Sequence, residues 1–287
     1  MSSEMFGGLT IKELILKTWR ESSEDNVSGG AAELAYYFLL ALFPMLIFLT
    51  SLVGFLPGAQ TSILNGLAKI APADALKLVE DTLADVISHR SGGLLSFGIL
   101  GTLWAASNGV ASLMSTLNIA YDAKEKRSFW KLRLIAVALT VTLALLIIGG
   151  AIFMMISNKL ADWLSSSFGF GPAFSIISSL VGYAIGLALL FIGIELLYYF
   201  GPDTKRNWRL ISPGAVFAVI AILAGSLLFS TYLRIAPNNS VTYGSLGAVI
   251  TLMLWLYLIG LALLVGGEIN SEIECAVGEQ KAVGGIK

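Results

Sequence analysis

Six long stretches of this chain contain no aspartate, glutamate, lysine, arginine or histidine, and this feature restricts the fold more than any other. A helix that crosses the hydrocarbon core of a bilayer needs about 20 apolar residues, whereas apolar runs of about 10–14 residues are typical of buried helices in soluble proteins. The runs are continuous rather than alternating, which excludes a membrane β-barrel. The stretches are residues 34–57, 94–121, 134–158, 173–194, 210–233 and 241–267. They predict an all-α, polytopic membrane protein with six transmembrane helices.

The composition excludes several classes of function. Only 13% of the 287 residues are charged, about half the share in a soluble domain, and the net charge is −1. A strongly basic surface for nucleic acid is therefore absent, so no nucleic-acid partner is expected. A single histidine, His89, and a single cysteine, Cys275, exclude a disulfide framework and a His- or Cys-rich metal cluster. No motif for ATP, flavin or haem is present, and we expect no cofactor.

The distribution of lysine and arginine predicts the orientation of the chain. The N-terminal segment carries three of these cations, the second loop five, the fourth loop three and the C-terminal tail two. The opposite set of loops carries five. Cytoplasmic loops of membrane proteins are enriched in Lys and Arg. Both termini are therefore predicted to lie in the cytoplasm, with the lipid bilayer as the solvent of the helices between them.

The predicted regions are a cytoplasmic interfacial helix within residues 1–30, a six-helix domain over 31–274 and a cytoplasmic tail over 275–287. In the first region Ile11, Leu14, Ile15 and Trp19 share one face, which is typical of a helix lying on a membrane surface. The outer loop 58–93 has helical spacing of apolar residues on both sides of Pro72, which predicts a short helical pair. A loosely ordered loop is the alternative.

The first and fifth stretches begin with similar small-residue motifs. The second and sixth stretches share a different small-residue motif. If they reflect an internal repeat, the two hairpins are related by an axis along the membrane normal. Chance recurrence of small residues is the alternative. Stripes of small residues on the second and fourth stretches either hold the bundle together or form the contact of a homo-oligomer.

Polar residues near the inner ends of the stretches are the candidate functional residues, because polar groups in lipid are costly. A vestibule that opens to the cytoplasm and binds a cation, a proton or a polar headgroup is one interpretation. Groups that extend to the interface and cap helix ends are the other. The candidates are Glu33, Asn118, Asp122, Glu195, Glu268 and Asn270.

Pro44 lies midway along the first stretch. Proline cannot donate to the carbonyl of Leu40, so a kink is predicted there. The kink either serves packing or acts as a hinge beside a cavity.

A series of short motifs lies along the chain in a specific order and spacing: Ala35-Tyr36-Tyr37, Leu42-Phe43-Pro44, Phe200-Gly201-Pro202, Trp208, Pro213-Gly214-Ala215, Tyr243-Gly244-Ser245-Leu246, Leu254-Trp255-Leu256-Tyr257 and Gly267-Glu268-Ile269-Asn270. By the order and spacing of these motifs the chain resembles the YihY/virulence factor BrkB family of bacterial inner-membrane proteins over nearly its whole length. One departure is Ala41, where the family pattern leads us to expect serine.

The resemblance implies a six-helix inner-membrane protein of unsettled function. Some members have been labelled ribonucleases, and transport of solutes or lipid-linked molecules has been proposed. A ribonuclease needs metal ligands or an acid–base pair beside a basic groove, and the chain offers neither, so we expect no enzyme. The favoured hypothesis is a transporter of a solute or lipid-linked molecule. A non-transporting scaffold or envelope-assembly factor is the alternative.

Overall fold

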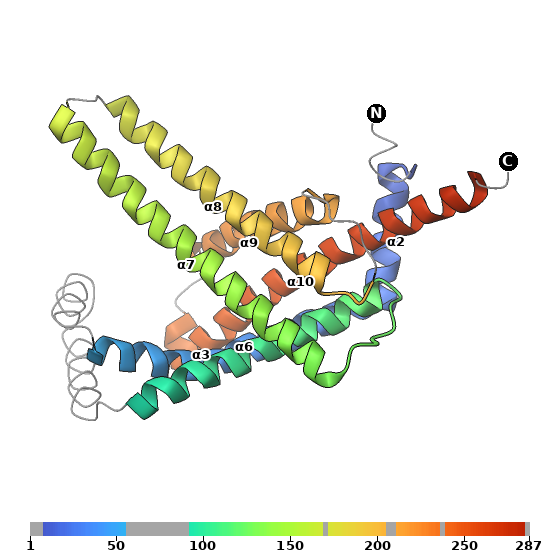
Figure 1. Ribbon diagram of the computed structural model, residues 1–287, viewed down its shortest axis with the longest axis horizontal. Helices are drawn as coiled ribbons and strands as arrows, with labels where there is room; N and C mark the ends of the chain where they lie inside the picture. Colours follow the sequence, from blue (N-terminus) through green and yellow to red (C-terminus); the bar gives the residue numbers. More distant parts are fainter. Residues whose placement is uncertain (1–7, 56–91, 169–171, 205–210, 236–238, 285–287) are drawn as a thin grey trace. The chain divides into compact units, whose positions relative to one another are not determined.

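The structure is a computed structural model that describes residues 8–55, 92–168, 172–204, 211–235 and 239–284 (Figure 1). Over these residues the secondary structure is helical. The helices are α2 (Ile11–Glu24), α3 (Val27–Phe55), α6 (Gly92–Ala120), α7 (Phe129–Phe168), α8 (Pro172–Phe200), α9 (Pro213–Ile235) and α10 (Asn239–Gly284).

Each of the six predicted stretches corresponds to one helix, from α3 to α10. Five helical segments are long and apolar enough to cross a bilayer: Ser96–Ala120, Phe129–Gly150, Ile177–Phe200, Pro213–Tyr232 and Val249–Val277. The described apolar part of α3, Val27–Leu42, is shorter than a span. The all-α, polytopic membrane fold is thus confirmed, while the sixth span and the cytoplasmic termini remain predictions. The helical pair predicted for 58–93 lies outside the described residues, except that α6 begins at Gly92.

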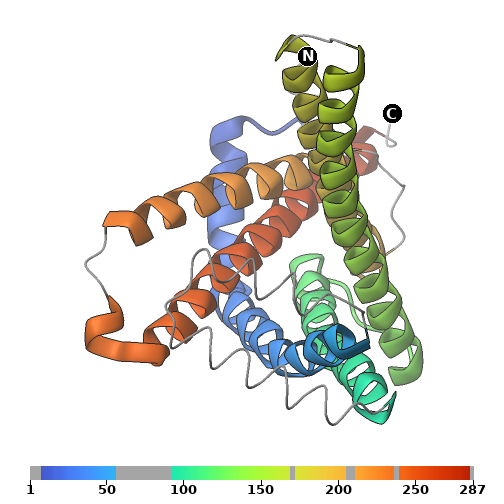
Figure 2. The same cartoon turned by 90° about the vertical axis from the view of Figure 1, so that its left-hand side faces the viewer.

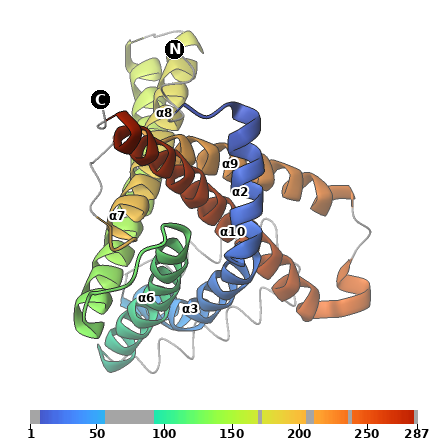
Figure 3. The same ribbon diagram turned by 90° about the vertical axis from the view of Figure 1, so that its right-hand side faces the viewer.

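The chain forms two compact units. The first comprises Met1–Ala35 and Gly109–Lys287, and the second comprises Tyr36–Asn108. In the first unit α7 lies beside α8 and α9 lies beside α10, as Figures 1 and 2 show. Helix α2 lies against α10 (Figure 3). Nearly all the polar contacts discussed below belong to this first unit.

Large apolar side chains on the outside of α7 to α9 are exposed. Leu145 of α7 is 65% exposed and Leu228 of α9 is 72% exposed. In water such a surface would be costly, but a bilayer solvates it with hydrocarbon. Leu117 and Tyr198, near the C-terminal ends of α6 and α8, are instead fully enclosed, as is Leu264 in the middle of α10. The outward direction of the apolar residues is what a membrane-embedded chain requires.

Helix α2 is amphipathic and begins with a capping box, in which the Thr10 side chain accepts from the Glu13 backbone while the Glu13 carboxylate accepts from Thr10. Leu14 is buried, whereas Ile15 and Trp19 are 62% and 79% exposed. The predicted apolar face therefore divides. One edge of α2 is buried within the first unit. The remaining apolar side chains are exposed and can contact the membrane surface.

Helices α9 and α10 approach closely at two glycines. A Cβ atom at Gly214 would overlap the carbonyl oxygen of Gly266, and a Cβ at Gly266 would overlap the hydroxyl of Tyr198. Small residues allow this kind of backbone contact between membrane helices.

In the second unit, Pro44 lies inside α3, as its place midway along the first stretch required. A Cβ at Gly101 of α6 would lie 3.2 Å from the Pro44 ring. Gly101 is the first residue of the small-residue stripe predicted on the second stretch, so the stripe faces the proline at that point. This contact is one that packing explains. The hinge at Pro44 stays a prediction.

We predict that Gly214→Ala lowers the stability of the folded protein in detergent by about 1–3 kcal/mol, because the added methyl group forces α9 away from α10. Gly225→Ala is the matched control on the same helix, since nothing lies within 4 Å of the added Cβ there. It should be neutral or slightly stabilising. The measurement is equilibrium unfolding of both variants in micelles. Equal stability of the two would contradict the close contact.

Candidate functional site

The N-terminal segment runs antiparallel to α10 and meets it through polar contacts. Lys17 Nζ lies 3.8 Å from a carboxylate oxygen of Glu272, and Ser28 Oγ lies 2.9 Å from Tyr257 Oη. Between these two contacts the side chains of Asp25 and Glu268 are hydrogen-bonded to each other. The carboxyl pair is therefore held where α2 ends.

The Asp25–Glu268 pair joins two groups that normally repel each other. Glu268 is 1% exposed, and its Oε1 atom has no hydrogen-bond partner among the described residues. Asp25, which caps the C-terminus of α2, is half-buried. Two carboxylates have no proton to donate, so a hydrogen bond between them requires that one be protonated.

The surroundings of the pair are acidic. Burial is the largest cause that raises the pKa of Asp25, followed by the charges of Asp122 and Glu21, while the bond from Glu268 acts in the opposite direction. Asp122 is exposed and follows the end of α6 with a φ of 48°. These neighbouring negative charges favour the neutral form of Asp25, which forms when its carboxylate binds a proton.

Two hydroxyl groups of α2 extend the buried polar contact. Thr18 and Ser22 lie four residues apart, with Asp25 three residues further along, so all three share one face of the helix. Thr18 Oγ1 and Ser22 Oγ are buried without a hydrogen-bond partner among the described residues. We call Thr18, Ser22, Asp25 and Glu268 the α2–α10 seam.

A second polar group satisfies the start of α9. Ser212 precedes Pro213 at the N-cap position, and its hydroxyl accepts from Ala215 N at 3.3 Å. Asn270 Oδ1 accepts from Gly214 N at 2.8 Å, and its amide donates to Ser212 Oγ at 3.0 Å. Glu195 Oε1 accepts from Ser212 N at 2.5 Å. The candidates Glu195 and Asn270 thus come together, and they hold the N-terminus of α9 against α8 and α10.

Tyr198 lies beside this cap and is fully buried. Its hydroxyl donates to the carbonyl oxygen of Leu263 at 2.6 Å, which joins α8 to α10. It also faces Gly266, whose missing side chain leaves the room that the hydroxyl occupies.

A third polar group fastens the loop after α6 to the loop after α8. Asn118 donates to Glu125 at 2.8 Å and accepts from Asp203 N at 2.6 Å. Arg127 donates to both oxygens of Glu125, at 2.8 and 2.7 Å, and to the carbonyl of Gly201 at 2.8 Å. The Arg127 guanidinium is the largest cause that lowers the pKa of Glu125, to about 2. We call this group the loop clasp.

The structure therefore distributes the six candidate residues over separate places. Glu195 and Asn270 form the cap of α9, Asn118 belongs to the loop clasp, and Asp122 and Glu268 belong to the acidic cluster. Glu33 of α3 is exposed. Whether any of them binds a substrate remains a prediction.

Sequence reasoning missed several residues of these groups, among them Asp25, Arg127, Tyr198 and Ser212. Ser212 carried a usable signal, because serine followed by proline marks a helix start. Asp25 stands in the polar N-terminal segment, outside every apolar stretch, and had no comparable signal.

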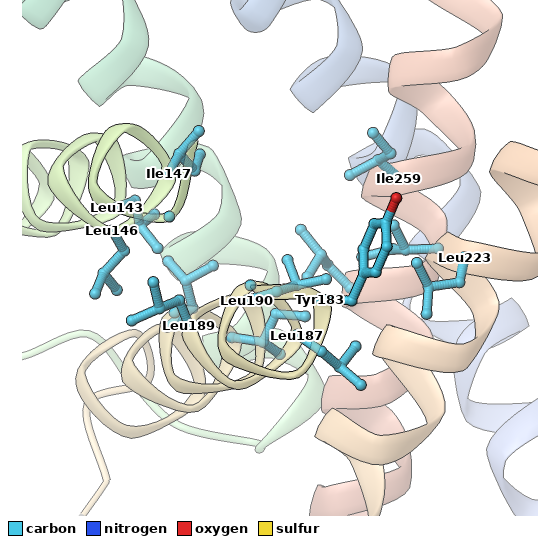
Figure 4. Close-up of a pocket in the computed structure, with 16 residues that line it drawn as sticks. Leu143, Leu146, Ile147, Tyr183, Leu187, Leu189, Leu190, Leu223 and Ile259 are labelled. Atoms are coloured by element: carbon cyan, nitrogen blue, oxygen red, sulfur yellow. The ribbon is translucent and has the colours of Figure 1, made fainter. Parts of the chain in front are cut away.

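A large apolar cleft lies among α7, α8, α9 and α10 (Figure 4). Its volume is about 660 Å³. Among the described residues that line it, only Tyr183 has a side chain with a polar atom, and Figure 4 shows this ring near Leu223 and Ile259. Tyr183 and Ile147 line the cleft yet are 66% and 71% exposed, so the cleft opens towards the surrounding bilayer. Its inner wall includes Leu263, whose carbonyl receives the Tyr198 bond.

Comparison with known proteins gives one family. The sequence profile of the family described as virulence factor BrkB matches residues 18–284. A Bacillus subtilis protein named putative ribonuclease-like protein YfkH is 39% identical over 241 residues, which cover 84% of this chain and 88% of that protein. A UPF0761 membrane protein of Psychromonas ingrahamii is 24% identical, covering 91% of this chain and 88% of the relative. The UPF0761 membrane protein NTHI0384 of Haemophilus influenzae is 24% identical, covering 95% and 98%. No solved structure matches.

We predict that Arg127→Ala destabilises the folded protein by about 1–3 kcal/mol at neutral pH, because it removes the two guanidinium hydrogen bonds to the Glu125 carboxylate and the one to the carbonyl of Gly201. The exposed Lys124→Ala in the same loop is the control and should change little. Since the pKa of Glu125 is lowered, the stability that the Glu125–Arg127 contact contributes is fully present above the ordinary glutamate pKa. This stability is lost as the pH falls towards about 2. Unfolding measured at several pH values should show the deficit of Arg127→Ala shrinking in acid. A constant deficit would contradict the clasp.

Proposed function

The chain belongs to the virulence factor BrkB family, and from this membership and the cleft we propose that it is a bacterial inner-membrane protein that binds and moves a lipid or lipid-linked molecule. The observation that carries the proposal is the apolar cleft among four helices. Its volume of about 660 Å³ lies within the range of small-molecule sites, about 300–1,000 Å³.

The lining of the cleft supports a hydrocarbon occupant. Apolar side chains and glycines form its wall, with Tyr183 as the single residue able to form a hydrogen bond through its side chain. A polar solute would lose its hydration there without replacement bonds, at a cost of several kcal/mol. An acyl or isoprenoid chain has no hydration to lose, because it passes from the hydrocarbon of the bilayer into the apolar cleft through the side that opens to the bilayer.

The position of the polar groups supports an amphipathic molecule in particular. Leu263 lies both in the wall of the cleft and in the bond from Tyr198, next to the cap of α9. In the predicted topology this end faces the cytoplasm. A lipid-linked molecule would place its chain in the cleft and its polar group towards that end.

A small polar solute is the less favoured substrate. The aqueous vestibule considered from the sequence requires that Glu195 and Asn270 present free polar atoms. The cap of α9 already engages Glu195 Oε1, Asn270 Oδ1 and the Asn270 amide. Opening it would leave backbone donors of α9 unsatisfied, which is costly in a membrane.

The scaffold alternative makes a different claim about the same cleft. A scaffold, or a homo-oligomer that buries the cleft, needs the apolar wall only for contact with another protein. A scaffold does not move lipids, so a substitution that fills the cleft would leave the rate of lipid movement at the background of empty liposomes.

The name of the Bacillus subtilis relative raises ribonuclease activity, which we do not propose for this chain. The carboxyl groups that the structure brings together, Asp25, Asp122 and Glu268, form an acidic cluster. Such a cluster repels RNA phosphates unless it holds metal ions, and among the described residues no group of three or more His, Cys, Asp or Glu side chains is placed to hold one.

We predict that Leu223→Trp, which extends a bulkier side chain into the cleft, reduces lipid movement across proteoliposomes several-fold. Leu228→Trp on the same helix is the matched control, since Leu228 is 72% exposed and does not line the cleft. Native mass spectrometry of both variants should show fewer retained lipids only for Leu223→Trp. If wild-type protein and both variants move lipids no faster than empty liposomes, the transport proposal is wrong and the scaffold gains.

We also predict that the purified protein does not cleave RNA, with or without divalent metal. The measurement follows single-stranded and double-stranded RNA over time, with a chelator and with Glu268→Gln as comparisons. Cleavage that a chelator or Glu268→Gln abolishes would overturn this prediction.

A further inference from the structure

We propose that Asp25 and Glu268 form a proton-binding site that clamps α2 onto α10, and that loss of the shared proton releases α2. The proposal concerns the contact between two helices and does not depend on lipid transport. Its ligand is a proton, and the device it controls is the amphipathic N-terminal helix.

The geometry of the pair is the first support. The two side chains are hydrogen-bonded to each other, which is feasible only while one carboxyl group carries a proton. Glu268 is 1% exposed, and its Oε1 atom has no partner among the described residues, so solvent does not stabilise an ionised form. Ionisation of both groups would place two negative charges in contact, as in carboxyl pairs that share one proton.

The surrounding charges make a second ionisation harder. Glu21 and Glu24 of α2, Asp122 after α6 and Glu272 of α10 all face the pair. Two cations of α2 contact other carboxylates. Arg20 contacts Glu21 at 2.6 Å and Glu24 at 3.6 Å, and Lys17 lies 3.8 Å from Glu272. Among the described residues the charged groups that act on the pair are acidic, so a proton is the neutralising charge that they favour.

The way α2 is attached makes the proton decisive. Its buried face offers Leu14, Thr18 and Ser22, and the two hydroxyls lack hydrogen-bond partners among the described residues. Its larger apolar residues, Ile11, Ile15 and Trp19, are exposed. Apolar burial therefore contributes little to holding α2 against α10. A released α2 keeps a favourable place on the membrane surface, where its exposed apolar residues enter the headgroup region.

The direction of the pH effect follows from Asp25. Its pKa is raised in the docked state, mainly by burial and then by the charges of Asp122 and Glu21. An acid with a raised pKa binds its proton more tightly when docked than when released. Docking is therefore strongest at low pH and weakens as the pH rises through the raised pKa of Asp25.

The test measures the accessibility of α2 in membranes. Ser22→Cys reports on the buried face and Ser23→Cys on the adjacent exposed position, both in a Cys275→Ser background because Cys275 is exposed. The labelling rate with a water-soluble maleimide is taken as the ratio of the two sites, which cancels most of the ionisation of the thiol itself. Between about pH 6 and about pH 9 the ratio should rise by about tenfold, because each pH unit above the pKa weakens docking by at most a factor of ten.

Charge-neutral variants decide the cause. Glu268→Gln can donate to Asp25 without a bound proton, so α2 should stay docked and the ratio should be flat with pH. Asp25→Asn should do the same, and because Asp25 is half-buried this second variant keeps the test intact if Glu268→Gln fails to fold. Glu33→Gln, an exposed carboxylate outside the cluster, should keep the wild-type slope.

Two results would overturn the proposal. One is a ratio that does not change with pH in the wild-type background, or a wild-type slope retained in both neutral variants. The other is a ratio that responds to sodium or potassium at fixed pH, which would make the pair a metal-cation site. Either result leaves the lipid-transport proposal standing, and failure of lipid transport leaves a pH-dependent clamp standing.

Discussion

Every backbone group that enters a bilayer must find its hydrogen bonds inside the protein, and the start of α9 shows how this chain meets that requirement. Proline at the first helical position removes one donor. Ser212 and Asn270 accept from the next two, and Glu195 accepts from Ser212 itself. The three acceptors come from the residue before α9, from α10 and from α8. Satisfying one helix end therefore fixes the arrangement of three helices, and the close contact between Gly214 and Gly266 follows from it.

The membrane class was predictable from the sequence because the hydrocarbon solvent acts on each helix independently. A run without charge has the same meaning wherever its neighbours lie, so all six stretches correspond to helices. The same reasoning identified Glu195, Glu268 and Asn270, since a polar residue at the inner end of such a run lies close to hydrocarbon, where it is costly. It could not supply their partners. The bond from Gly214 to Asn270 joins residues 56 apart, and Asp25 meets Glu268 across most of the chain. Asp25 lies in a polar segment outside the apolar stretches, where the sequence indicates no desolvation cost for an acidic side chain. Its neighbours in the sequence therefore gave no sign of a buried partner.

Depth in the membrane and direction around a helix are separate properties, and the sequence reveals the first more readily than the second. The candidate residues were grouped because all approach the same predicted boundary. Each position on a helix turns by about 100° from the last, so residues at one depth face different neighbours. Asn118 therefore turns to the loop clasp, whereas Asp122, beyond the end of α6, turns to Asp25. Glu33, at a similar predicted depth, is exposed.

The three polar groups differ in how completely their atoms are satisfied, and this difference separates rigid from movable contacts. In the cap of α9 and in the loop clasp, each of Glu195, Asn270 and Arg127 forms at least one short hydrogen bond, and opening either group leaves buried donors unpaired. In the α2–α10 seam, Thr18, Ser22 and Glu268 already have atoms without partners, so separating the helices sacrifices little and allows water to hydrate them. A proton on the carboxyl pair is then the main attraction that holds the seam closed. The helix joined by this seam is also the one whose exposed apolar face fits the membrane surface, so its undocked state has a stable place to occupy.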